Sequence, residues 1–226
     1  MSYDWVFFDA DGTLFDYEAA ERAALEGAFA FFRLPLPASA GSTYSGINAA
    51  IWREYERGEI TQAKLRTIRF DRLFEELGLS LDSEEFSGRY LEILGRQAGL
   101  LEDAEEVVRT LSLSVGLVLI TNGLAEVQRP RFAASSIGSC FIDIVVSEEV
   151  GLAKPDPAIF DLAFERIGRP AKDRVLMVGD NLGSDIIGGV GYGLDTCWYN
   201  PRGTANGHGV EPSYEIRELR QILDLV

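Results

Sequence analysis

Short apolar runs along the chain predict the strands of a buried parallel sheet. The runs are WVFF at 5–8, VGLVLIT at 115–121, FIDIVVS at 141–147, RVLMVG at 174–179 and TCWY at 196–199. They lack the alternation of polar and apolar residues that a half-exposed strand shows, so both faces of the sheet should be covered. Helical patterns lie between or after them, at 104–113, 157–167, 182–192 and 216–225. Strands that alternate with helices predict an α/β fold with a Rossmann-like, doubly wound parallel sheet.

Residues 17–98 break this alternation, because no convincing strand occurs there. Apolar residues such as Leu65, Leu73 and Leu77 recur at helical spacing instead. We therefore expect an all-helical cap domain over 17–98, inserted into a core domain formed by 1–16 and 99–226. An insertion after the first strand lies beside the carboxyl ends of the strands, where open α/β sheets bind ligands, so it is placed to act as a lid.

The composition is that of an ordinary globular protein. The chain has 226 residues, of which 25% are charged and 46% hydrophobic. No apolar run approaches the ~18 residues that a membrane span needs. The N-terminal stretch MSYDWVFFDADG is acidic where a signal peptide would be basic. We expect a cytoplasmic protein without a disulfide framework, in which Cys140 and Cys197 are small buried hydrophobes.

The net charge of −15 limits the partners that the protein can bind. Such a surface repels nucleic-acid polymers and anionic membranes. A small phosphorylated substrate remains possible if a cation or local basic groups neutralise it. The single histidine, His208, excludes sites built on several histidines, and a Ser-His-Asp triad would have to use this one loop residue.

Carboxylates follow the first predicted strand. Asp9 and Asp11 stand two residues apart, and repulsion between them raises the proton affinity of one. Mg²⁺ would relieve this repulsion, because it is a hard cation that prefers oxygen ligands. Gly12 allows the sharp turn that brings backbone amides close to an anion. The alternative is a simple turn, since Asp-Gly is common in turns.

The fourth predicted strand also ends in acidic residues, Asp180 and Asp185. Asp180 could ligate a metal directly, and Asp185 could bind it or orient its water. Alternatively, Asn181 or Asp185 is only a helix cap or a first-turn acid that favours the helix dipole. Four acids at two strand ends fit one metal site with oxygen ligands better than they fit two unrelated turns.

Two further strand ends supply groups for an anion. Thr121 and Asn122 follow the second strand, where a hydroxyl and amides at a helix start can hold phosphate or simply cap the helix. Lys154 follows the third strand in a loop with prolines, and only three lysines occur in the chain, so it is a candidate point charge for phosphate. Together the strand ends carry the groups for Mg²⁺-assisted phosphoryl transfer through an aspartyl intermediate.

These motifs resemble those of the haloacid dehalogenase-like hydrolase superfamily. Its four motifs match DADGT at 9–13, TN at 121–122, Lys154 and GDNLGSD at 179–185, in chain order. The stretches DWVFFDADGTLF, WREYERGEIT and SEEVGLAKPDPAIFDLAFERIG are similar to the pyrimidine 5′-nucleotidase branch. One departure is Gly12, where members of that branch often carry Glu.

The resemblance implies a role for each motif residue. Asp9 would be the nucleophile. Asp11 would protonate the leaving oxygen and then activate water, and its backbone carbonyl would be a Mg²⁺ ligand beside the carboxylates of Asp9 and Asp180. Asp185 would support the metal through water. The phosphate would be held by Thr121, Asn122 and Lys154.

The resemblance also ranks the possible activities. Dehalogenases of the superfamily lack an aspartate at the position of Asp11, so a phosphate ester is favoured over a haloacid. Phosphonate cleavage would need a cap lysine, and the cap offers only Lys64 on a polar helix face. We expect a 5′-nucleotidase for pyrimidine or non-standard nucleotides. The alternatives are a phosphoglycolate-type phosphatase, a hexose-phosphate mutase and a non-catalytic phosphate-binding scaffold.

The cap should contribute to substrate choice, but its sequence names no site residue. Trp52 and Tyr55 could stack on a base, and nearby arginines could meet phosphate or carbonyl groups. We expect instead that the aromatic residues face the cap core and that the arginines lie on its solvated face, namely Arg53, Arg57, Arg69 and Arg72.

Overall fold

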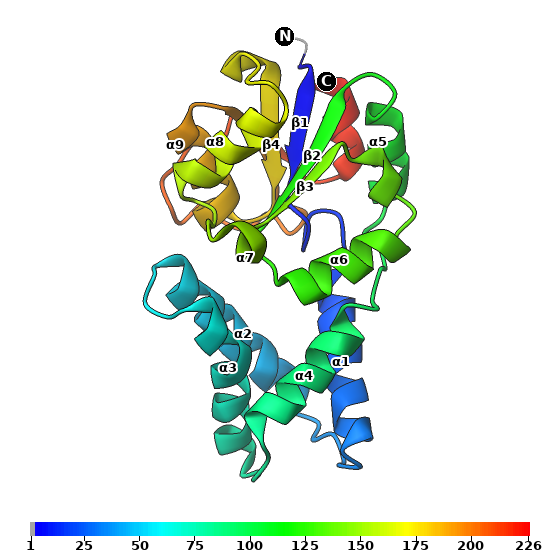
Figure 1. Ribbon diagram of the computed structural model, residues 1–226, viewed down its shortest axis with the longest axis vertical. Coiled ribbons are helices and arrows are strands. Elements are labelled where there is room, and N and C mark those ends of the chain that lie inside the picture. The colour runs from blue at the N-terminus through cyan, green and yellow to red at the C-terminus, as the bar shows by residue number, and fades with distance from the viewer. Residues whose placement is uncertain (1–2) are drawn as a thin grey trace.

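The protein consists of an α/β lobe and a helical lobe, stacked along the long axis of the molecule (Figure 1). The computed structural model describes residues 3–226. The sheet of the α/β lobe has the strand order β3-β2-β1-β4-β5-β6, and all neighbouring strands are parallel. Its strands are β1 (Trp5–Phe8), β2 (Gly116–Thr121), β3 (Asp143–Val146), β4 (Val175–Gly179), β5 (Asp195–Tyr199) and β6 (Tyr214–Ile216).

Helices cover both faces of the sheet. Helix α5 (Ala104–Leu111) and the C-terminal 3₁₀ helix (Leu219–Asp224) pack on the face that carries Val6 and Phe8. Helix α8 (Pro157–Arg166) packs on the face of Phe7, and α9 (Ile187–Tyr192) packs beside it. Successive residues of β1 are therefore buried on opposite faces, which explains why the strands are apolar throughout.

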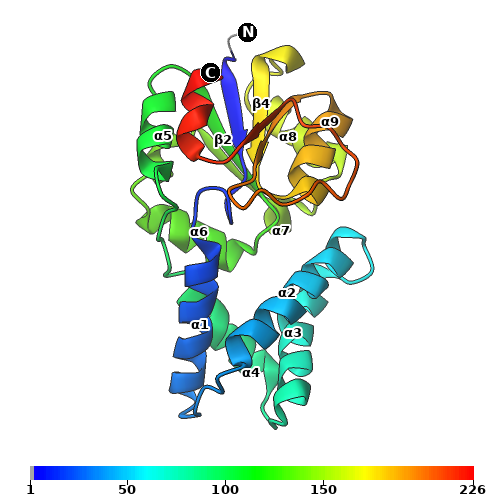
Figure 2. The same cartoon turned by 180° about the vertical axis from the view of Figure 1, so that it is seen from behind.

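The helical lobe is a bundle of four helices (Figure 2). They are α1 (Tyr17–Phe31), α2 (Ala40–Glu56), α3 (Gln62–Leu77) and α4 (Ser83–Leu94). Phe70, Phe86 and Tyr90 form an aromatic cluster in its core. The side chains of Asp16 and Asp82 accept hydrogen bonds from first-turn N–H groups and so cap α1 and α4.

The helical lobe meets the α/β lobe at the carboxyl ends of the central strands. Helices α6 (Ala125–Ala134) and α7 (Ser147–Val150) lie at this junction (Figure 1). Leu124 and Val127 belong to the apolar cluster of the helical lobe, which therefore continues onto α6. Leu101 N–H donates to the carbonyl of Leu14, so the segments that enter and leave the helical lobe lie side by side.

The predicted fold class is confirmed, and the five predicted strands are present within one or two residues at each end. The prediction of a helix over 216–225 is wrong in its first part, because Ile216 pairs with Tyr199 in β6 and only 219–224 form a 3₁₀ helix. The segment 182–192 begins as a π-helical turn (Leu182–Ile186) before α9. The exact division at 16/17 and 98/99 stays a prediction.

Two smaller expectations also have outcomes. Within residues 3–226, no helix is long and apolar enough to cross a membrane. Both cysteines are free; Cys197 is fully buried, but Cys140 is only half-buried.

Candidate active site

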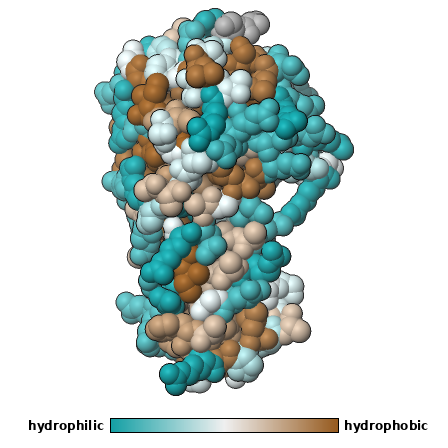
Figure 3. All heavy atoms as spheres, turned by 90° about the vertical axis from the view of Figure 1, so that its right-hand side faces the viewer, coloured by the Kyte–Doolittle hydropathy of each residue, from teal (hydrophilic) through white to brown (hydrophobic). Residues whose placement is uncertain are grey.

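The candidate site lies where β1, β2 and β4 end. The N–H of Asp9 donates to the carbonyl of Val178 at 2.9 Å, so the sheet pairing continues to the first acidic residue. A pocket of about 510 Å³ opens there between the two lobes, and core residues Asp9, Thr121 and Lys154 line it. In the space-filling view the molecule narrows between the lobes and a notch opens at one side (Figure 3).

Buried acidic side chains surround a single ammonium group at the base of this pocket. The Nζ of Lys154 lies 2.6 Å from Asp9 Oδ1 and 2.7 Å from Asp185 Oδ1. Lys154 also donates to the carbonyl of Ile120 at 2.6 Å. Lys154 and Asp185 are almost fully buried, and Asp9 is 8% exposed. Residues from β1, from the loop after β3 and from the turn after β4 thus meet at one point.

Burial and charge shift the acid–base properties of these groups. Burial raises the pKa of Asp9 to about 7, although the charge of Lys154 opposes the shift. Burial, followed by repulsion from Asp9, raises the pKa of Asp180 well above its usual range. The pKa of Lys154 is also raised, because the attraction of Asp185 and Asp9 outweighs the cost of burying its charge. Lys154 therefore carries its charge at neutral pH.

The carboxylates of this centre fit a divalent cation. Oxygen atoms of Asp9, Asp180 and Asp185 all lie within 4.8 Å of one another. One ammonium group does not balance three carboxylates, and repulsion from Asp9 and Asp185 adds to the effect of burial in raising the pKa of Asp180. Hard oxygen donors of this kind are the ligands that Mg²⁺ prefers. The donor set thus matches the ion that the sequence predicts.

The turn after β4 fixes the orientation of Asp180 and Asp185. The side chain of Asn181 accepts hydrogen bonds from the N–H groups of Gly183 and Ser184 and so caps the π-helical turn. The N–H of Asn181 donates to Asp185 Oδ2 at 3.0 Å. Trp198 Nε1 donates to the carbonyl of Asp180 at 2.9 Å. Asn181 is therefore a helix cap, and Asp185 lies in the first turn as the alternative interpretation predicts, while its Oδ1 pairs with Lys154.

The two predicted phosphate-binding segments lie next to each other. The side-chain amide of Asn122 donates to the carbonyl of Lys154 at 2.8 Å and accepts from its N–H at 2.8 Å. Thr121 lines the pocket, and its hydroxyl accepts a hydrogen bond from the N–H of Gly123 at 3.0 Å. Asn122 thus fixes the loop that carries Lys154. Its predicted contact with phosphate stays a prediction.

Asp11 is held by two residues that the sequence analysis missed. Gln128 Nε2 donates to Asp11 Oδ2 at 2.6 Å, and Arg131 Nη1 pairs with Asp11 Oδ1. Arg131 is fully buried, and its guanidinium lies 5.2 Å from the centre of the Phe15 ring. A signal existed in the sequence, since Gln128 and Arg131 are polar residues three positions apart on one face of the helix after TNG. Thr13 was also missed as a neighbour of both Asp9 and Asp180, at 3.5 and 3.4 Å.

Helices of the helical lobe form the opposite wall of the pocket. This wall includes Glu21, Asn48, Trp52 and Arg53. The expectation that Trp52 faces the cap core is therefore wrong, because Trp52 is only half-buried and lines the pocket. The solvated position expected for Arg69 is also wrong, because its side chain is buried. Its guanidinium lies over the rings of Phe70 and Tyr90 and donates a hydrogen bond to the side-chain oxygen of Asn48.

Comparisons with known proteins agree with this geometry. A sequence model described as haloacid dehalogenase-like hydrolase matches residues 3–193. The pyrimidine 5′-nucleotidase YjjG of Escherichia coli (strain K12) is 32% identical and aligns with 100% of this chain and 99% of its own length. The pyrimidine 5′-nucleotidase PynA of Streptococcus pneumoniae is 32% identical over 99% of this chain and 95% of its own.

A solved structure resembles the protein over its whole length. The HAD-hydrolase YfnB of Bacillus subtilis, in a crystal form bound to magnesium that reveals interdomain movement, superposes with a TM-score of 0.95. The two chains are 34% identical, and the match covers 100% of this chain and 99% of the other. Fold and sequence thus indicate the same family.

Proposed function

The chain belongs to the haloacid dehalogenase-like hydrolase family, and from this premise we propose that it is a magnesium-dependent phosphomonoesterase that acts on 5′-nucleotides. One observation carries the proposal. The carboxylate of Asp9, paired with Lys154, lies beside Asp180 and Asp185 at the base of a pocket that both lobes enclose.

In the proposed reaction, residues of this chain act in two successive displacements at phosphorus. In the first, an oxygen of Asp9 attacks phosphorus, the ester bond breaks, and Asp11 gives its proton to the leaving oxygen. In the second, Asp11 takes a proton from the water that attacks the aspartyl phosphate, and phosphate leaves as Asp9 is regenerated. Lys154 neutralises phosphoryl oxygens throughout, and Thr121 offers its hydroxyl to them.

Asp9, Asp180 and the backbone carbonyl of Asp11 would hold Mg²⁺, with Asp185 as support through water. When bound, the ion supplies positive charge that offsets the repulsion between the substrate's phosphate and the carboxylates. The buried, mutually repelling carboxylates described above support this assignment.

The nucleotide substrate rests on the relatives and on the pocket. Two relatives that match almost the whole chain are pyrimidine 5′-nucleotidases. The pocket's cap wall offers the ring of Trp52 for stacking on a base. A volume of about 510 Å³ lies within the range of small-molecule sites.

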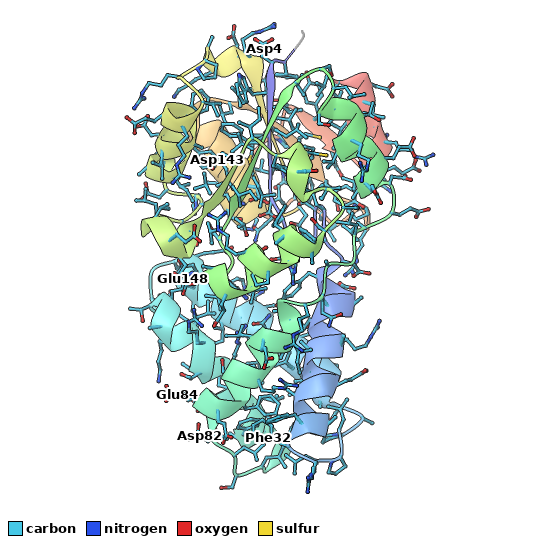
Figure 4. All side chains as sticks on the ribbon, turned by 45° about the vertical axis from the view of Figure 1, so that its right-hand side comes forward. Asp4, Phe32, Asp82, Glu84, Asp143 and Glu148 are labelled. Carbon is cyan, nitrogen blue, oxygen red and sulfur yellow. The ribbon has the colours of Figure 1, made fainter. Side chains whose placement is uncertain are left out.

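Release of inorganic phosphate from nucleoside monophosphates tests the mechanism. We expect Asp11→Asn to lower kcat at least about 100-fold, since general acid–base catalysis contributes that much or more. Asp9→Asn should abolish turnover because it removes the nucleophile. Asp4→Asn is the matched control, because Asp4 lies at the far end of the sheet and pairs with Arg174 (Figure 4).

Full turnover in both Asp9→Asn and Asp11→Asn would contradict the mechanism. A panel that includes phosphoglycolate and hexose phosphates tests the substrate separately. The nucleotidase assignment fails if one of these is hydrolysed far more efficiently than every nucleotide.

Thermal unfolding tests the metal without reference to activity. Mg²⁺ at 100 times its Kd should stabilise the protein by about 2.7 kcal/mol, and we expect this shift in Tm to vanish in Asp180→Asn but to persist in Asp4→Asn. An equal shift in Asp180→Asn and the wild type would exclude Asp180 as a ligand.

A further inference from the structure

The wall of the pocket contributed by the helical lobe carries an organised acidic subsite. Glu21 of α1 is only 6% exposed, yet it lines the pocket. Its Oε1 accepts a hydrogen bond from the Ser45 hydroxyl, and its Oε2 accepts one from Asn48 Nδ2 at 2.9 Å. Both oxygens therefore receive hydrogen bonds from α2, and the carboxylate is held in one orientation.

A second layer fixes the residues that hold Glu21. Asn48 Oδ1 accepts a hydrogen bond from Arg69 Nη1 at 3.2 Å, and Asn48 Nδ2 also donates to the Tyr17 hydroxyl at 3.0 Å. Arg69 is 1% exposed and lies over the rings of Phe70 and Tyr90. A side chain supported in this way by three helices is preorganised for recognition.

The charges of the pocket differ between its two walls. The core wall holds Lys154 and the predicted metal ligands, which suit a phosphate. The cap wall holds the carboxylates of Glu18, Glu21 and Glu56. Glu18 pairs with Arg202, which leaves Glu21 and Glu56 with the one guanidinium that lines this wall, that of Arg53. A leaving group that enters this wall therefore meets excess negative charge, and carboxylate oxygens accept hydrogen bonds but cannot donate them.

We propose that Glu21, held by Ser45 and Asn48, selects phosphate esters whose leaving group is neutral and donates hydrogen bonds, and rejects esters whose leaving group carries a second negative charge. This inference rests on the proposed phosphatase function and narrows its substrate class. Nucleosides fit it, since their hydroxyl and N–H groups are donors. Glycolate and glycerate leaving groups do not, because a like charge near a buried carboxylate is unfavourable.

A pair of small substrates that differ mainly in this charge tests the proposal. Glycerol 1-phosphate and 3-phosphoglycerate both offer a hydroxylated three-carbon leaving group, but only the second carries a carboxylate. We expect the wild type to favour glycerol 1-phosphate at least about tenfold in kcat/KM. Glu21→Gln keeps the size of the side chain and removes its charge. It should therefore lower the ratio of kcat/KM for glycerol 1-phosphate to kcat/KM for 3-phosphoglycerate about tenfold.

For uridine 5′-monophosphate, Glu21→Gln should raise KM about tenfold with little change in kcat, because a hydrogen bond to a charged acceptor is lost. Glu26→Gln is the matched control: Glu26 is an exposed acid on the same helix, outside the pocket, and its variant should match the wild type on every substrate.

The proposal is overturned if Glu21→Gln leaves the ratio of the two glycerol-derived substrates unchanged, or if Glu26→Gln changes it equally. These outcomes are separate from failure of the nucleotidase assignment. A wild type that hydrolyses no nucleotide refutes that assignment, while the ratio still reports whether Glu21 discriminates by charge.

Discussion

At the scale of single residues, the most informative contact is the one that holds Asp11. The proposed acid–base residue is not loose in the pocket; Gln128 and Arg131 bind both of its carboxylate oxygens. Both come from α6, which begins directly after the TN motif. The same short segment thus carries the predicted phosphate-binding residues and the two residues that orient Asp11.

We predict that Arg131→Met slows the hydrolysis of phosphate esters with poor leaving groups more than the hydrolysis of esters with good leaving groups. Such a variant leaves Asp11 without its fixed direction, and proton donation matters most when an alkoxide departs. For a nucleotide we expect kcat to fall about 10- to 100-fold, and for p-nitrophenyl phosphate much less. Steady-state kinetics on the two substrates measures the difference between the two losses in kcat.

The matched control is Arg129→Met, since Arg129 lies on the same helix but pairs with Glu149 at the surface. Equal losses on both substrates in Arg131→Met would indicate a merely structural role for Arg131.

At the scale of elements, the sequence predicts the central sheet well and places the acidic residues of the candidate site at one edge of it. The strands are continuous apolar runs, and parallel strands place their carboxyl ends at one edge of the sheet. The proximity of Asp9, Thr121 and Asp180 could therefore be predicted from the sequence. The short edge strand β6 was missed because Tyr214–Ile216 is too brief and mixed to show a pattern.

The cap wall of the pocket could not be predicted in the same way. Which face of a helix lines the pocket depends on how α1–α4 pack against one another, and the hydrophobic pattern of a single helix does not predict that packing. Arg69 shows the difficulty, because a charged residue on a helix is normally exposed and here lies in an aromatic core.

Glu21 should also make the stability of α1 and α2 depend on pH. Burial raises its pKa, while hydrogen bonds from Ser45 and Asn48 oppose the shift. Since the folded pKa lies above the unfolded value of 4.5, folding binds the proton more tightly, and this stabilisation is lost as pH rises through the folded pKa. The Tm of Glu21→Gln minus that of the wild type should therefore be more positive at pH 7.5 than at pH 4.

The neighbouring Tyr17 and Arg69 do not titrate in this range: burial holds the pKa of Tyr17 well above 10, and the guanidinium remains charged. Thermal unfolding of both chains at the two pH values measures the difference, with Glu26→Gln as control. A difference in Tm that is the same at both pH values would contradict the assignment.

At the scale of the whole molecule, ion pairs cross from one lobe to the other. Arg66 of α3 pairs with Glu126 of α6 and, at 2.7 Å, with Glu148 of α7. Glu148 lies at the junction of the lobes (Figure 4), and its second oxygen accepts from the N–H of Ala125 at 2.8 Å. These contacts favour the arrangement in which both lobes line the pocket.

We predict that Arg66→Gln weakens this arrangement. Partly exposed ion pairs contribute up to about 1 kcal/mol, so KM for a nucleotide should rise about three- to tenfold, and the effect of added salt on KM should diminish. Arg72→Gln is the control, because Arg72 pairs with Glu54 inside the helical lobe at 2.8 Å. A KM that is unchanged in Arg66→Gln, or raised equally in Arg72→Gln, would refute the role of the junction.

The place of the helical lobe in the chain has a consequence for how the polypeptide reaches its native state. Trp5 of β1 pairs with Gly116 and Val175, so the first strand has no partner until the entire bundle and the chain as far as β2 have been made, and its second partner comes only with β4. Contacts in the bundle are local in sequence and form quickly, whereas closing the sheet requires distant segments to meet. During synthesis the bundle should therefore fold first, while β1 remains an exposed apolar segment that chaperones or self-association can capture.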